Sequence, residues 1–236
     1  MSSKNSSEAL DLFLKELGER EQFIERVPRK IIWLSGAPGA GKGTNESYII
    51  DHFKLYEKPL IASSLLNGQE MREKINRGLL LDDVTVVSAV FDGLINPIYN
   101  PGVLVDGFPR TLGQAKSVVW LQDHFKERHI ATYFSVVVLM LDEVESVHRQ
   151  LHRGLRALQH NERVRQSGKG VLKEVRSTDL DPAIAKQRYA LFMKETYVAL
   201  QFLKKSLPFV EISCGGSLET VKGRVLSSMS AIEAYK

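Results

Sequence analysis

The sequence predicts an α/β protein in which a five-stranded parallel sheet carries helices on both faces. Short apolar runs alternate with stretches whose apolar residues recur every three or four positions, a pattern typical of parallel sheets that are covered on both sides. The 236 residues are 43% hydrophobic and 25% charged, which suits a globular domain and suffices for a sizeable core. A glycine-rich turn directly follows the first apolar run. Ligands of such sheets bind beyond the carboxyl ends of the strands, so this turn is the first candidate site.

The elements are expected in the following order along the chain. Residues 8–27 form an amphipathic helix with Ser6 or Ser7 as its N-cap, because apolar residues such as Leu10, Leu14 and Leu17 lie at helical spacing. A packing role is favoured over a targeting or partner-binding role, since the segment is rich in acids, which transit peptides lack. Strands are then expected at residues 31–34, 59–61, 103–105, 134–141 and 209–212. Residues 62–97 and 154–181 interrupt the alternation and are expected to be insertions over the functional edge.

Composition excludes several classes of protein and leaves one question open. The single cysteine, Cys214, excludes an internal disulfide framework and a multi-cysteine zinc site, and it fits a reducing compartment. The most apolar stretch, residues 133–141, is far shorter than the about 20 residues that a membrane span needs, so we expect a soluble, cytoplasmic protein. With 32 Lys and Arg against 28 Asp and Glu, the net charge is +4. This mild excess is compatible with nucleic acid, an acidic membrane surface or small polyphosphates as partners.

The turn after the first strand has the composition of a phosphate-binding loop. It reads Gly36-Ala37-Pro38-Gly39-Ala40-Gly41-Lys42-Gly43-Thr44. Glycines let backbone N–H groups surround a phosphate chain, and the helix expected from about Gly43 adds its positive end. Lys42 is placed to reach the terminal phosphates, and the Thr44 hydroxyl to face magnesium or a phosphate oxygen. The loop departs from the general pattern because Gly43 stands at the usual Ser/Thr position. The alternative, a glycine-rich turn without a ligand, is disfavoured by the strand–loop–helix context.

A second motif follows the third strand and completes a resemblance to a known family. Asp106-Gly107-Phe108-Pro109-Arg110-Thr111 begins with an aspartate at a strand end, the expected place for a carboxylate that orients magnesium or its waters. With Gln114 three residues further on, this motif and the phosphate loop together resemble the nucleoside monophosphate kinases, among them the adenylate kinases most closely. The resemblance covers residues from about 30 to the C-terminus. It implies a P-loop NTPase three-layer fold over residues 29–236, with a monophosphate-binding insertion (62–97), a lid (154–181) and an N-terminal extension (1–28).

The resemblance also implies roles for residues at matching positions. On the ATP side, Arg149 would pack on the base and Arg153 would contact the phosphates; Arg110, Arg176 and Arg188 would surround the transferred phosphoryl group. Convergent guanidinium groups suit the spread charge of that group. On the acceptor side, four residues would bind the monophosphate, namely Gly107, Arg110, Arg176 and Arg188, and Gln114 would read the adenine edge. The alternative for Gln114 is an exposed helix residue. Mg²⁺ would arrive with ATP. His148 and His152 have the spacing of two metal ligands on a helix, but a helix surface is favoured, and no zinc is expected.

The monophosphate side departs from the family pattern. The family's pattern S-T-G-D-L-L-R ends in an arginine that grips the monophosphate; this chain reads Ala62-Ser63-Ser64-Leu65-Leu66-Asn67, followed by Gly68, and lacks that arginine. Ser63 keeps a hydroxyl at the position of the family's threonine, and Leu81 lies in a segment that resembles the loop lining the monophosphate base. Arg72 and Arg77 are the candidates to replace the missing arginine, of which Arg72 is favoured; a helix-surface role is the alternative. Asp179 is a candidate for a lid hinge contact or a helix cap, while Pro182 favours Asp181 as an N-cap.

The resulting expectation is a monomeric, adenylate-kinase-like enzyme that converts ATP·Mg²⁺ and AMP into two ADP. The first alternative is a monophosphate kinase with a preference for UMP, CMP or dAMP. The second, from another class, is a nucleotide-binding switch or a nucleic-acid-binding ATPase. Residues 148–190 hold ten Lys and Arg against four Asp and Glu, a net +6, whereas the rest of the chain sums to −2. The positive charge therefore belongs to the lid-like segment and indicates nucleotide phosphates as partners, without nucleic acid or membrane.

Overall fold

A parallel five-stranded sheet forms the centre of the protein. The computed structural model describes residues 2–66, 68, 73 and 80–233. The strands are β1 (Lys30–Gly36), β2 (Leu60–Ile61), β3 (Val103–Asp106), β4 (Tyr133–Met140) and β5 (Phe209–Ser213). Their spatial order is β2-β3-β1-β4-β5, and every neighbouring pair is parallel. The predicted strands are thus confirmed, with ends shifted by at most two residues.

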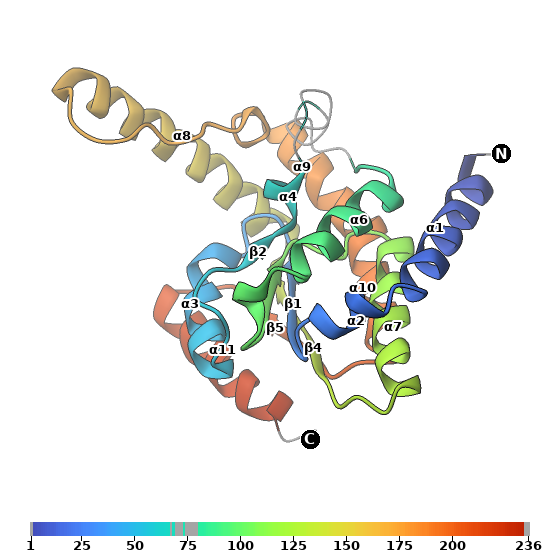
Figure 1. Ribbon diagram of the computed structural model, residues 1–236. Coiled ribbons are helices and arrows are strands. Elements are labelled where there is room, and N and C mark those ends of the chain that lie inside the picture. Colours follow the sequence, from blue (N-terminus) through green and yellow to red (C-terminus); the bar gives the residue numbers. More distant parts are fainter. Residues whose placement is uncertain (1, 67, 69–72, 74–79, 234–236) are drawn as a thin grey trace.

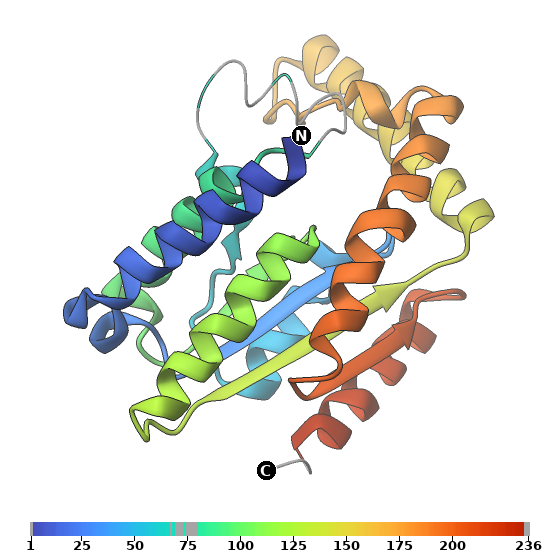
Figure 2. The same cartoon turned by 90° about the vertical axis from the view of Figure 1, so that its right-hand side faces the viewer.

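Helices cover both faces of this sheet, as predicted. They are α1 (Ser2–Gly18), α2 (Glu21–Arg26), α3 (Lys42–Phe53), α4 (Ala62–Leu65), α6 (Asp83–Leu94), α7 (Leu112–Glu127), α8 (Glu143–Ser167), α9 (Pro182–Leu191), α10 (Tyr197–Leu203) and α11 (Leu218–Glu233), with short turns η1 (Pro97–Tyr99), η2 (Ser177–Asp179) and η3 (Phe192–Thr196). The helices α3 and α11 lie on one face, and α7 and α10 lie on the other (Figures 1 and 2). Within the described chain, no helix combines the length and apolar character that crossing a membrane requires.

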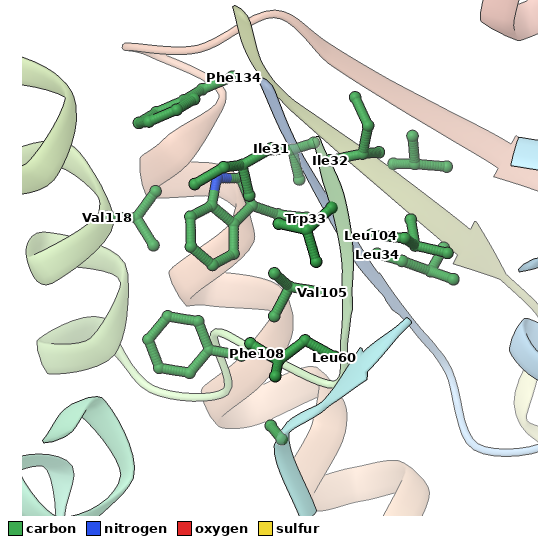
Figure 3. Close-up of a cluster of buried hydrophobic side chains, with 14 of the residues drawn as sticks. Ile31, Ile32, Trp33, Leu34, Leu60, Leu104, Val105, Phe108, Val118 and Phe134 are labelled. Carbon is green, nitrogen blue, oxygen red and sulfur yellow. The ribbon is translucent and has the colours of Figure 1, made fainter. Parts of the chain in front are cut away.

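The core centres on β1, whose side chains are buried on both faces of the sheet. Ile31, Ile32, Trp33 and Leu34 are all fully buried, which explains why this strand reads as an uninterrupted apolar run. Figure 3 shows the Trp33 ring between Phe108 and Phe134, and its centroid lies 5.6 Å and 6.4 Å from theirs. This packing fixes the position of β1, the strand that leads directly into the phosphate loop.

The N-terminal segment is two helices and not the single helix predicted over residues 8–27. The first, α1, begins at Ser2, so the predicted N-cap at Ser6 or Ser7 is wrong, and it ends at Gly18. Glycine has poor helix propensity, and Arg20 takes a non-helical conformation before α2 begins. Three leucines of α1, at positions 10, 14 and 17, are buried, and the helix packs against α6 and α7 (Figure 1). The segment is therefore part of the core.

The predicted lid segment contains the second part of α8, which extends away from the sheet (Figure 1). Asp142 caps this helix by accepting a hydrogen bond from the Glu145 backbone, and Gly168 ends it in a left-handed conformation. The chain then returns alongside α8, where the Asn161 carboxamide donates to the Lys173 carbonyl (2.8 Å) and accepts from the Lys173 N–H (2.7 Å). This pair of bonds joins the returning chain to the helix. Asp181 caps α9, as predicted, through the backbone N–H groups of residues 183 and 184.

Candidate active site

Most of the predicted ATP-binding and catalytic residues line a cleft at the carboxyl ends of the strands, whereas Gly36 and Ala37 are buried and do not line it. Its volume is about 1040 Å³. Its lining includes residues 38–46, which form the phosphate loop and the start of α3, and Asp106 at the end of β3. Arginines from the loop before α7, from α8, from the chain that returns after α8 and from α9 complete it: Arg110, Arg149, Arg153, Arg156, Arg176 and Arg188. Eight Lys and Arg and five Asp and Glu line the cleft, which gives it a net positive charge suited to an anionic ligand.

The phosphate loop has the backbone geometry that its glycines predict. Gly39 and Gly41 have φ angles of 79° and 84°, a left-handed region that other residues seldom occupy. The loop is fixed on one side by a hydrogen bond from the Ser146 hydroxyl to the Pro38 carbonyl (2.6 Å) and on the other by Asn45 Nδ2, which donates to the Gly41 carbonyl (2.9 Å). No side chain of the described residues caps α3. The Thr44 N–H donates to the Gly41 carbonyl (3.1 Å), and the N–H groups of Lys42 and Gly43 before it remain available to an anion among the described residues.

Lys42 and Asp106 both line the cleft, and their charges interact. Burial lowers the pKa of Lys42 below its ordinary value, while the Asp106 carboxylate acts to raise it. Nearby guanidinium groups, including those of Arg110 and Arg153, lower that pKa further. Asp106 Oδ1 is buried and has no hydrogen-bond partner among the described residues. An unpartnered buried carboxylate oxygen is costly, and it suits a ligand that brings a cation or ordered water. Thr44 also lines the cleft.

Arg110 is anchored through both its backbone and its side chain. Its N–H donates to Gln114 Oε1 (2.8 Å), and its carbonyl accepts from the Thr196 hydroxyl (3.0 Å) in the π-helical turn η3. Its Nε donates to the Gly107 carbonyl (2.8 Å). Burial lowers the pKa of Arg110, and Asp106 opposes that shift. Neither Arg110 nor Lys42 forms an ion pair within the described part of the chain, so both charges are available to a ligand.

Two of the predicted catalytic arginines share one buried carboxylate. Asp179, 2% exposed, accepts from Arg153 Nε (2.6 Å) and Nη2 (2.8 Å) and from Arg188 Nη1 (3.0 Å). Of the two interpretations offered by the sequence, the described contacts show no helix-capping bond from Asp179; its carboxylate instead joins Arg153 of α8 to Arg188 of α9. Arg176 lies near Glu174, with 3.6 Å between Nε and Oε2, and its side chain is half exposed.

Arg149 links α8 to the loop that precedes α11. It donates to Glu145 Oε1 (2.6 Å) and more weakly to the Gly216 carbonyl (3.4 Å). The rings of His148 and His152 stack on the same helix with centroids 5.9 Å apart, and both line the cleft. The described residues contain no group of three or more His, Cys, Asp or Glu that could bind a metal ion.

A smaller pocket of about 30 Å³ adjoins the cleft and contains most of the predicted monophosphate-binding residues. It is lined by Ala62, Ser63, Leu66, Leu80, Leu81, Val86, Gly107, Arg110 and Gln114. Gln114 is 2% exposed, so the alternative of an exposed helix residue is wrong. Of the other predicted members, Arg176 and Arg188 line the larger cleft. Arg72 lies outside the described residues, as does Asn67.

The sequence reasoning missed two residues that the structure places in these networks. Thr196 holds the Arg110 carbonyl from η3, and no sequence pattern marks that contact across 86 positions. Asp83, the first residue of α6, contacts both Thr111 and Gln114. It lies in the segment that resembles the loop lining the monophosphate base, so the sequence indicated the segment but not the contacts of Asp83 with Thr111 and Gln114.

Comparison with known proteins agrees with this geometry. No family model matches the chain. An adenylate kinase from Azobacteroides pseudotrichonymphae is 37% identical over 134 residues, which are 52% of this chain and 66% of that protein. Adenylate kinases from Leptospira biflexa and Parasynechococcus marenigrum are 28% and 27% identical, over 85% and 83% of this chain and 100% and 96% of their own lengths. The P-loop NTPase fold, the paired motifs and these relatives together show that the chain belongs to the nucleoside monophosphate kinase family of phosphotransferases, close to the adenylate kinases.

Proposed function

We propose that the protein transfers the γ-phosphoryl group of Mg²⁺-bound ATP to AMP and releases two ADP. The observation that carries this proposal is the convergence of Lys42, Arg110, Arg153, Arg176 and Arg188 on one cleft that also contains the unpartnered carboxylate of Asp106. Such an arrangement supplies what phosphoryl transfer needs, namely positioning and compensation of negative charge.

On the donor side, the phosphate loop would bind the triphosphate. The N–H groups at the start of α3 and the Lys42 ammonium would contact the β- and γ-phosphates. Asp106 would hold the magnesium ion that ATP brings, directly or through its waters, and Thr44, which lines the same cleft, would face that ion or a phosphate oxygen. Arg149 would pack against the base, where α8 meets the loop at Gly216.

On the acceptor side, Arg110 would bind the monophosphate and Gln114 would read the base. Ser63, Leu81 and Gly107 line the same small pocket as these two residues, which supports the assignment. A free monophosphate oxygen is already a nucleophile, so this chain needs no general base. The bond between the γ-phosphorus and its bridging oxygen breaks, a bond to the AMP oxygen forms, and the Arg153, Arg176 and Arg188 guanidiniums offset the charge on the transferred group.

Residues 154–181 would act as a lid that excludes water, which would otherwise accept the phosphoryl group. Arg153 and Arg188 are joined to this segment by Asp179. Closure would therefore carry two positive charges along with the lid.

The test is a coupled assay of the full chain with Mg²⁺·ATP and a panel of nucleoside monophosphates. Turnover with AMP at a kcat/KM at least tenfold above those for UMP, CMP and dAMP is expected. Turnover with UMP, CMP or dAMP but not with AMP would refute AMP as the acceptor and identify the reacting monophosphate as the substrate instead. No turnover with any monophosphate would reject kinase activity, and tight binding to RNA with a steep dependence on salt would then favour a nucleic-acid-binding ATPase.

A further inference from the structure

Asp83 connects two helices that flank the small pocket. It is the first residue of α6, and its Oδ1 accepts from the Thr111 hydroxyl (2.5 Å) and from Gln114 Nε2 (3.1 Å). Thr111 is the N-cap of α7 and Gln114 lies in its first turn. The carboxylate therefore sits at the positive end of α7, where a negative charge is stabilised.

The sequence of α7 makes room for this carboxylate. A Cβ atom on Gly113 would collide with Asp83 Oδ2, so a glycine is needed for the close approach of α6. Leu10 of α1 lies behind the same position, 3.4 Å from that Cβ site. The contact is thus supported by a small residue on one side and by the buried N-terminal helix on the other.

The two contacts of Gln114 determine which way its carboxamide faces. A carboxylate can only accept hydrogen bonds, so the Gln114 group that contacts Asp83 must be the Nε2 amide group. A backbone N–H can only donate, so the Gln114 atom that contacts the Arg110 N–H must be Oε1. Turning the carboxamide over would place Oε1 against a carboxylate oxygen and Nε2 against an N–H. One Nε2 hydrogen and one Oε1 lone pair remain for a ligand, and the positions of this donor and this acceptor cannot be exchanged.

We propose that Asp83 is a positioning residue that sets the base preference of the monophosphate site through Gln114. The fixed carboxamide suits a base that presents a ring nitrogen acceptor beside an exocyclic amino donor, as adenine does. A base with a ring N–H beside a carbonyl, as in hypoxanthine, presents the reverse order. Misaligned polar groups in a buried site lose affinity because they stay unpaired. This inference rests on the proposed function, in which Gln114 reads the base.

The test compares AMP with IMP, which differ in that edge of the base alone, in the wild type and in Asp83→Asn. The variant keeps the shape of the side chain but lets its amide offer either a donor or an acceptor to Gln114. We expect the AMP-to-IMP ratio of kcat/KM to fall about tenfold, through a higher KM for AMP and a lower KM for IMP, while kcat with saturating AMP changes less than twofold. Isothermal titration calorimetry of both monophosphates, without ATP, should give the same change in the ratio of Kd values.

Asp82→Asn is the matched control. Asp82 is the neighbouring acid and caps α6 through the Thr85 N–H, a role that asparagine also performs. If Asp83→Asn has the same AMP-to-IMP ratio of kcat/KM as the wild type, the proposed role of Asp83 is overturned. An equal loss of kcat/KM with both nucleotides would also overturn it, because a merely structural effect causes such a loss. A wild type that neither binds nor phosphorylates AMP would instead refute the proposed function, and the base reading with it.

Discussion

Replacing Asp179 with alanine should lower the free energy of unfolding by about 3 kcal/mol. The carboxylate is 2% exposed and accepts three hydrogen bonds from Arg153 and Arg188. Removing one partner from a buried ion pair costs about 3–5 kcal/mol, because the remaining charge stays desolvated. The lower end applies here, since the Arg153 side chain is 44% exposed and can be rehydrated, whereas that of Arg188 is 22% exposed.

Differential scanning calorimetry measures this loss. For a chain of this length, each kcal/mol shifts the Tm by about 2–4 °C, so Asp179→Ala should melt about 6–12 °C below the wild type. Asp181→Ala is the control, because it removes an exposed N-cap two residues away at a cost of about 1 kcal/mol. Equal melting temperatures for the two variants would show that the shared carboxylate does not hold α8 and α9 together.

Three further predictions concern the cleft and its frame. Arg110→Ala should reduce kcat/KM by at least about 100-fold in the coupled assay with circular dichroism unchanged, because a transition-state charge contact is lost; near-wild-type activity would reject its role. The affinity for ATP, measured by calorimetry, should fall as pH rises through the lowered pKa of Lys42, since phosphate binding favours the protonated amine. Lys42→Arg stays charged, so its ATP affinity should depend less on pH. Identical pH dependence in the two proteins would contradict a contact between Lys42 and the ATP phosphates. Gly154→Ala should lower the Tm although alanine favours helices, because its Cβ would collide with the Asp179 carbonyl; an increase would contradict that packing.

The sheet could be predicted because its signals are local. Five apolar runs alternate with helical patterns, and each became a strand of the parallel sheet. The break between α1 and α2 could not be predicted, because apolar residues continue at helical spacing on both sides of Gly18. There, a local conformation at Arg20 outweighs the periodicity.

The site divides in the same way between local and long-range signals. The phosphate loop and Asp106 could be found because each motif lies within a few residues and directly after a strand. Asp83 and Asp179 could not be assigned, because their partners lie up to 31 positions away and the helices' packing alone brings them together. Sequence motifs therefore predicted many of the residues that line the cleft, and the structure adds the contacts that orient them.

The most direct test of the central claim follows the phosphorus atoms themselves. With Mg²⁺·ATP and AMP, ³¹P NMR should show two ADP formed for each AMP consumed, and no reaction when Mg²⁺ is chelated. Lys42→Met should reduce this rate by at least about 100-fold, while Lys58→Met, which changes an exposed lysine, should react like the wild type. Wild-type rates in Lys42→Met, or no ADP formed from AMP by the wild type, would contradict the account.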